Sequence, residues 1–254
     1  MGKIFNRIYT RWENPGLLLI AQQRGLQFDW IIEAGCHDGS DTLKFLELQN
    51  VLKVYAFEPD IRAADKAEKR YHAYGGKVSF SRLALMDKPG YIQLSSPTGN
   101  FGDGTTTIQS YYEELPSFTS IGDLIPCSTL DFQLLNSQKG MRGRGLMWLD
   151  VEGSAAKVLA GASRVLEFVD LIQVEVDLHD STHRRGNFQE VNDYLKGKNF
   201  AIIYGPIHPG FFGDAIYIRK TELSFTGRRR SEFLGFLMRV THRLIYPLLQ
   251  IPKR

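Results

Sequence analysis

Acidic side chains follow two apolar runs of strand length near the start of this 254-residue chain. Glu33 opens the segment Glu-Ala-Gly-Cys-His-Asp-Gly, which contains Gly35 and Gly39, and Glu58 follows the next run about 20 residues later. A glycine-rich turn between a strand and a helix is the usual seat of a nucleotide-like ligand, because the backbone approaches closely and the helix offers free N–H groups. An acid at the distance of Glu58 can accept hydrogen bonds from ribose hydroxyls.

The side chains inside this turn restrict the ligand. The segment is not G-x-G-x-x-G, because Cys36, His37 and Asp38 occupy its middle. The carboxylates of Glu33 and Asp38 would repel a pyrophosphate and attract a ligand that carries an ammonium and a sulfonium, as S-adenosylmethionine does. Taken singly, Glu33 and Glu58 could be polar strand ends, but together at the ends of adjacent strands they favour a binding site.

A second group of acids follows two later apolar runs. Asp150 and Glu152 end one run, and Glu175, Asp177 and His179 end the next. Residues at i and i+2 of an extended strand point the same way, and open α/β sheets bind ligands at this carboxyl edge. A carboxylate or an imidazole at this edge can remove a proton from a bound ligand, so Asp150, Glu152 and His179 are the candidate general bases.

The same acids permit a metal site. Asp150, Glu152 and Asp177 could bind Mg²⁺, which would anchor a diol and lower the pKa of a hydroxyl. A third interpretation is structural, with Glu152 capping the following helix and Asp177 in a solvated loop. The sequence leaves these three alternatives open.

The elements that must position these residues alternate between strand-length apolar runs and amphipathic helical stretches, a pattern typical of βαβ units. It predicts a Rossmann-like α/β fold, with an about seven-stranded, mostly parallel sheet and helices on both faces. The predicted strands are 29–34, 53–58, 78–80, 146–151, 171–176, 200–204 and 215–218, and the clearest helices are 60–72, 154–166 and 188–198.

Three segments complete the expected organisation. Residues 1–28 form an N-terminal helical extension, 29–220 the main domain and 221–254 a basic amphipathic tail. Within the domain, 95–128 is an irregular region that could be an acceptor lid, with Tyr111, Tyr112 and Phe118 stacking on a sugar, or a disordered insertion.

Several motifs together resemble the FkbM family of methyltransferases. They are 33–39, Ala-Phe-Glu-Pro at 56–59, 83–90, Ser-Thr-Leu-Asp at 128–131, Asp-Val-Glu-Gly at 150–153 and 158–162. The resemblance covers roughly residues 29–220 and implies a class I methyltransferase that uses S-adenosylmethionine to methylate a hydroxyl of a sugar, polysaccharide or related metabolite. The family usually has Asp where Glu33 stands and often has Asn where His37 stands.

The resemblance also implies which residues contact the cofactor. Glu33 and Gly35 would border the methionine part, Glu58 would bind the ribose, and Leu83 and Ala84 would lie beside the adenine. The remaining expected cofactor residues belong to the same loops: His37, Asp38, Gly39, Pro59 and Asp150.

Composition narrows the remaining possibilities. Apolar residues make up 43% and charged residues 23%, as in ordinary globular domains, and the net charge of +3 does not indicate a nucleic-acid-binding face. Two cysteines predict no disulfide framework and a cytoplasmic protein. The basic tail could contact a membrane surface, pack on the domain or join a second subunit in a homo-oligomer.

Two other function classes stay open at this point. The first is an NAD(P)-dependent oxidoreductase on a Rossmann fold, disfavoured by the missing G-x-G-x-x-G and by the lack of a Tyr-x-x-x-Lys pair after the fourth strand. The second is a non-catalytic binding module of the same fold, since fold alone does not settle function.

Overall fold

The computed structural model describes residues 17–48, 50–96, 107–108, 119–136, 141–177, 188–205 and 212–223. Its centre is a seven-stranded sheet in the order β10-β11-β9-β8-β1-β2-β3. The strands are β1 (Trp30–Ala34), β2 (Lys53–Phe57), β3 (Val78–Ser81), β8 (Gly145–Leu149), β9 (Val169–Asp177), β10 (Phe200–Tyr204) and β11 (Phe212–Arg219). Only β11 runs antiparallel to its neighbours within this sheet. The predicted class I α/β sheet is therefore confirmed.

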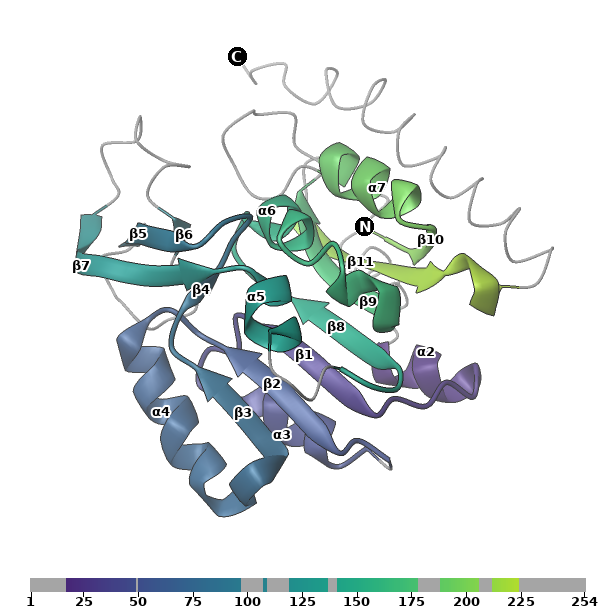
Figure 1. Ribbon diagram of the computed structural model, residues 1–254, viewed down its shortest axis with the longest axis horizontal. Helices are drawn as coiled ribbons and strands as arrows, with labels where there is room; N and C mark the ends of the chain where they lie inside the picture. The colour runs from purple at the N-terminus through teal and green to yellow at the C-terminus, as the bar shows by residue number, and fades with distance from the viewer. Residues whose placement is uncertain are drawn as a thin grey trace, which may run out of the picture.

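Helices cover both faces of this sheet (Figure 1). One face packs on α2 (Leu17–Gln23), α3 (Ser40–Leu46) and α4 (Ile61–Tyr71), and the other on α5 (Leu130–Leu135), α6 (Ala155–Ala160) and α7 (Phe188–Gly197). Short 3-10 turns occupy His72–Lys77, Val165–Phe168 and Lys220–Glu222.

Successive side chains of each strand point to opposite faces of the sheet and contribute to two buried cores, one on each face. Ile32 of β1 faces α5–α7, whereas its neighbour Ile31 faces α2 and α3. Both are fully buried, as expected for a central parallel strand covered on both sides. The same alternation puts Glu33 on the α2–α4 face.

A second, four-stranded sheet adjoins the first near its carboxyl edge (Figure 1). It has the order β4-β7-β5-β6, with β4 (Ala84–Leu85), β5 (Gly90–Ser96), β6 (Thr107–Ile108) and β7 (Thr119–Ser128). The prediction of an irregular 95–128 region was thus wrong for its ends. β5 and β7 pair antiparallel over most of their length, and local sequence does not reveal such non-local pairing. Tyr111, Tyr112 and Phe118 lie outside the described residues, so the lid stays a prediction.

The helix predicted over 154–166 ends early, at Ala160. Asp131 at the start of α5 explains the break, because its backbone N–H donates to the Gly161 carbonyl and its carboxylate accepts from the N–H groups of Arg164 and Val165. Any Cβ at Gly161 would lie 2.1 Å from the Met86 carbonyl oxygen. The chain therefore turns here to fasten α6 to α5 and to the segment after β4.

The chain's ends are described in part. The helix α2 belongs to the expected N-terminal extension, and residues 224–254 of the basic tail lie outside the described part. Among the described residues, no helix has the length and apolar character needed to cross a membrane.

Candidate active site

The loop after β1 closes against the ends of two neighbouring strands. The N–H groups of Gly35 and Cys36 both donate to the Phe57 carbonyl of β2, at 2.9 and 3.0 Å. On the other side, a Cβ at Gly35 would lie 1.7 Å from the Asp150 carbonyl oxygen, and the φ of Gly35 is +79°. Only glycine fits this position, so the loop draws the tips of β1, β2 and β8 together.

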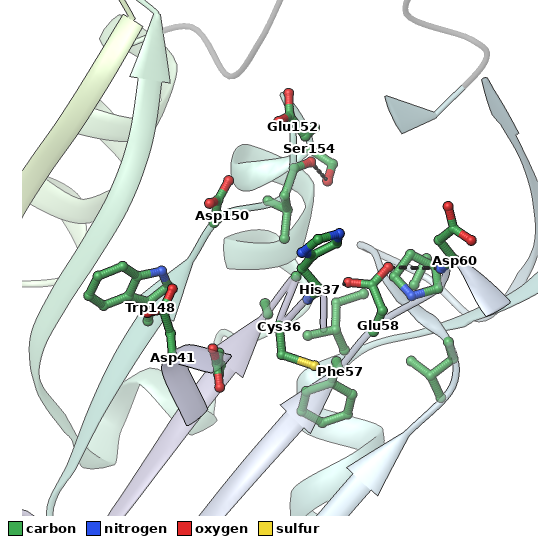
Figure 2. Close-up of a pocket in the computed structure, with 18 of the residues that line it drawn as sticks. Cys36, His37, Asp41, Phe57, Glu58, Asp60, Trp148, Asp150, Glu152 and Ser154 are labelled. Atoms are coloured by element: carbon green, nitrogen blue, oxygen red, sulfur yellow. Dashed lines mark hydrogen bonds between the residues drawn. The ribbon is translucent and has the colours of Figure 1, made fainter. Parts of the chain in front are cut away.

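His37 adopts a left-handed backbone conformation, with a φ of 47°. Asparagine and histidine are enriched in this region relative to other side chains, because their polar groups tolerate it locally. The departure from the family's usual asparagine at this position therefore preserves the turn. Its imidazole projects into the cavity between Glu58 and the segment after β8 (Figure 2).

Glu58 is fixed at the end of β2 by two backbone donors. Its Oε2 accepts from the N–H of His37 and its Oε1 from the N–H of Asp60, each at 2.8 Å. Its residue exposure is only 7%, and this burial raises the pKa of Glu58 to about 7 despite the two hydrogen bonds. Because each carboxylate oxygen retains a second lone pair, Glu58 can accept two further hydrogen bonds from hydroxyl groups.

Glu33 lies deeper, at 2% exposure. Thr42 of α3 donates from its hydroxyl to Oε2 of Glu33. Burial raises the pKa of Glu33 to about 8, while the hydrogen bond from Thr42 opposes that rise. A cationic ligand beside Glu33 would favour the ionised carboxylate.

These residues line one cavity of about 230 Å³ (Figure 2). It brings together eight of the ten predicted cofactor residues: Glu33, Gly35, His37, Glu58, Pro59, Leu83, Ala84 and Asp150. Asp38 and Gly39 are not among its described lining residues. Asp38 instead pairs with Arg70 of α4 at 2.7 Å and accepts from the N–H of Ser40, so it shapes the loop from outside.

The candidate bases stand at the opposite side of the cavity, after β8. Asp150 and Glu152 both line it, but the extended-strand argument for their shared direction was wrong. β8 ends at Leu149, and Glu152 has a φ of 45° in the turn before Gly153. A glutamate held in this region costs on the order of 1 kcal/mol, a strain often found at functional sites. His179 lies outside the described residues.

A carboxylate cluster forms here with a different third member than predicted. Ligand atoms of Asp150, Glu152 and Glu175 lie within 4.8 Å of one another. Glu175 comes from β9, whereas the position of the Asp177 side chain lies outside the described part. Three oxygen donors of this kind suit a hard divalent cation, and they can equally attract the proton of a hydroxyl.

Several lining residues were not singled out from the sequence, and Trp148, Asp60 and Leu94 are three of them. Trp148 lay within a predicted strand, Asp60 began a predicted helix, and Leu94 lay outside every predicted element. Asp60 does cap α4, by accepting from the N–H of Arg62. Leu94 reaches the cavity from β5, so the second sheet contributes to its wall, which no local sequence signal could have indicated.

Comparison with known proteins agrees with this geometry. A family model described as the methyltransferase FkbM domain matches residues 33–202, from the first acid to the end strands of the sheet. The chain belongs to the FkbM methyltransferase family. The family resemblance expected from the motifs is thereby confirmed.

Among curated FkbM relatives is the 2-O-methyltransferase NoeI of Sinorhizobium fredii (strain NBRC 101917 / NGR234), which is 28% identical over 152 residues. The match covers 57% of this chain and 62% of NoeI, so the chain spans less than two thirds of that relative.

Two solved structures are similar to part of this chain at low sequence identity. The methyltransferase FkbM from Methylobacillus flagellatus KT is 14% identical with a TM-score of 0.48, over 74% of this chain and 42% of that protein. The magnesium protoporphyrin IX methyltransferase of Synechocystis PCC 6803, solved with bound S-adenosylmethionine, is 12% identical with a TM-score of 0.38, over 74% and 69%.

Proposed function

We propose that this FkbM-family chain transfers a methyl group from S-adenosylmethionine to a hydroxyl oxygen of a sugar, a polysaccharide or a related metabolite. The observation that carries the proposal is that Glu58, Glu33 and the Asp150–Glu152 segment line the same cavity. Its acids match, in order, a ribose diol, an ammonium and a hydroxyl that must lose its proton.

The side chains fit such a methyl donor part by part. Glu58 has both oxygens fixed by backbone donors, which leaves it an acceptor for the two ribose hydroxyls. Leu83, Ala84 and Leu85 offer apolar surface for an adenine ring. Glu33 carries the charge opposite to that of an ammonium. When bound, S-adenosylmethionine would supply an electrophilic methyl group on its sulfonium.

The protein's own chemical task is then to orient the acceptor and remove its proton. Asp150 and Glu152 stand at the cavity, and either carboxylate can take the proton of a hydroxyl aligned with the methyl group. The left-handed turn at Glu152 sets the direction of its Cα–Cβ bond. His179 remains a third candidate base by sequence alone.

The charge of the cavity favours a neutral acceptor. Its lining contains six carboxylates and, among the described residues, no lysine or arginine. The carboxylates are Glu33, Asp41, Glu58, Asp60, Asp150 and Glu152. A phosphorylated or carboxylated acceptor would be repelled, whereas a neutral polyol offers only hydroxyl donors. The name of the relative NoeI, a 2-O-methyltransferase, supports oxygen as the methylated atom.

Binding and transfer assays test this proposal. Calorimetry should detect binding of S-adenosylhomocysteine and none of NADH; heat with NADH alone would favour an oxidoreductase instead. With methyl-labelled S-adenosylmethionine and neutral glycosides as acceptors, label should appear as an alkali-stable methyl ether. Binding without any transfer to a broad glycoside panel would favour a non-catalytic module.

The base is identified by matched variants. Glu152→Gln and Asp150→Asn should each retain affinity for S-adenosylhomocysteine, and the variant that lacks the base should lose most of the turnover, typically 10²–10⁴-fold. Glu68→Gln, an exposed change on α4, serves as the control. Full turnover in both site variants would transfer the role to His179.

The cluster of Asp150, Glu152 and Glu175 supports a second proposal for the same site, a Mg²⁺ ion that anchors a diol of the acceptor. Activity should then disappear after treatment with a chelator and return with Mg²⁺. Glu175→Gln should raise the Mg²⁺ concentration needed for half-maximal activity. Chelator-resistant turnover would reject the metal and leave the acids as bases.

A further inference from the structure

A line of hydrogen bonds joins Glu33 at the cavity to the buried hydroxyls of Thr42 and Tyr71, in the layer of helices behind β1. The Thr42 hydroxyl of α3 donates to Oε2 of Glu33, and the same oxygen of Thr42 lies 2.6 Å from the Tyr71 hydroxyl of α4. Thr42 has no exposed surface, Glu33 has 2% and Tyr71 has 6%. The line therefore connects the cavity to two helices through side chains that are almost fully buried.

The protons of this line have a defined direction. Thr42 carries one hydroxyl proton, which it donates to Glu33. When Glu33 is ionised and accepts this proton, the contact between Thr42 and Tyr71 is a donation from the Tyr71 hydroxyl to the Thr42 oxygen. Both hydroxyl dipoles thus point their positive ends towards the carboxylate, an arrangement that favours its ionised form. In agreement, the Thr42 hydrogen bond opposes the burial that raises the Glu33 pKa.

Tyr71 also packs against Gly39, at the end of the loop between β1 and α3. A Cβ at Gly39 would lie 2.6 Å from the Tyr71 hydroxyl oxygen, and the Tyr71 ring contacts Phe80 of β3 edge-on at 5.3 Å between centroids. The ring is thus held from two sides. Its hydroxyl therefore reaches Thr42 from a fixed position.

We propose that Thr42 and Tyr71 are positioning residues for the methyl donor, which orient the Glu33 carboxylate towards the ammonium of the donor's amino-acid part and stabilise its ionised form when that ammonium is bound. The inference rests on the proposed function, because it assumes that this cavity binds S-adenosylmethionine. Thr42 occupies Oε2, so Oε1 is the oxygen that accepts from the ammonium. The nucleoside part of the donor lies at Glu58 and does not depend on this line.

Two probes separate these parts of the donor. S-adenosylhomocysteine has both the nucleoside and the amino-acid part, whereas 5′-methylthioadenosine has the nucleoside without the ammonium. In calorimetry, Thr42→Val should weaken S-adenosylhomocysteine binding about tenfold or more, as expected for loss of a hydrogen bond to a charged group, and change 5′-methylthioadenosine binding less than about twofold. Thr42→Ser should restore binding of S-adenosylhomocysteine.

A double variant distinguishes positioning from a purely structural role. Each single change, Thr42→Val or Tyr71→Phe, removes a hydrogen bond from a buried polar group and should lower the melting temperature. Thr42→Val with Tyr71→Phe also removes the Tyr71 hydroxyl that has lost its contact with Thr42, so stability should recover in part. Binding of S-adenosylhomocysteine should stay as weak as in Thr42→Val, because Glu33 still lacks its donor. Recovery of that binding together with stability would overturn the proposal, and so would equal losses for both probes.

Failure of the proposed function gives a different result. If the wild-type protein binds neither probe, the cavity is not a site for this donor. Glu58→Gln should weaken both probes alike, because both contain the ribose, and it therefore serves as the contrast to Thr42→Val. Unchanged S-adenosylhomocysteine binding in Thr42→Val, with normal wild-type binding, would reject only the positioning role.

Discussion

The backbone N–H of His37 donates a 2.8 Å hydrogen bond to Oε2 of Glu58, which joins the loop after β1 to the end of β2. The two residues are 21 positions apart in the chain. The bond fixes one carboxylate oxygen, and the N–H of Asp60 fixes the other. The orientation of Glu58 therefore exists before any ligand binds.

Glu58→Gln tests this preorganised acceptor. The new amide NH₂ would face a backbone N–H, either from His37 or from Asp60, and the pair of ribose hydroxyls would lose one acceptor. We expect the affinity for S-adenosylhomocysteine to fall about 10- to 100-fold. Calorimetry measures the change, with the exposed substitution Glu68→Gln as the control. Equal affinities in wild type and Glu58→Gln would place the ribose elsewhere.

Gly35→Ala tests the close approach of β1 and β8. Its Cβ would lie 1.7 Å from the Asp150 carbonyl oxygen, and the backbone φ is +79°, so both sterics and conformation oppose the change. We expect a loss of about 2 kcal/mol or more in the free energy of unfolding, together with weaker cofactor binding.

Gly76→Ala is the matched control, because a Cβ there meets no atom within 4 Å and no unusual φ is required. Urea unfolding of both variants measures the difference. If Gly35→Ala were as stable as Gly76→Ala, the strand ends would not be in the contact described.

His37 allows a test of the left-handed turn. Asparagine tolerates a φ of 47°, whereas a β-branched residue is strongly disfavoured there. His37→Asn should leave the free energy of unfolding within about 0.5 kcal/mol, and His37→Val should lower it by about 1–2 kcal/mol. Equal stability of the two variants in urea unfolding would contradict the turn geometry.

Sequence alone predicted much of this architecture because the strongest signals are local. The buried run that becomes β10 matched at both ends, and the helix capped by Asp60 was also expected. Each depends on apolar periodicity or on a capping residue within a few positions. The end of α6 was missed because Asp131 imposes it from a segment 33 positions away.

The site residues likewise divide into those with a local sequence signal and those that only tertiary contacts bring in. Glu33 and Glu58 were found because each follows an apolar strand and their spacing is characteristic. Leu94 was not anticipated, since the second sheet reaches the cavity through non-local pairing. Glu175 was expected among the acids at the two strand ends, but the predicted metal set had Asp177 in its place. Asp38 was expected at the cofactor, and its ion pair with Arg70 of α4 is likewise a tertiary contact.

The raised pKa of Glu33 predicts how the stability of the protein without ligand changes with pH. Its pKa is about 8 in the folded chain, against 4.5 for an ordinary glutamate. The folded state therefore retains a proton in the range between these values that the unfolded state has lost. Stability from this group is complete below about 4.5 and falls as pH rises through about 8.

Glu33→Gln removes this ionisation and should therefore flatten the profile. Urea unfolding at pH 6 and pH 9, without cofactor, should show a larger decrease for wild type than for Glu33→Gln, because ionising a carboxylate that is 2% exposed is unfavourable. The exposed change Asp65→Asn on α4 should leave the wild-type difference intact. Glu58, with a pKa raised to about 7, contributes in the same direction in all three proteins, so only the difference between profiles reports on Glu33. Identical profiles for wild type and Glu33→Gln would mean that this carboxylate is already ionised at pH 6.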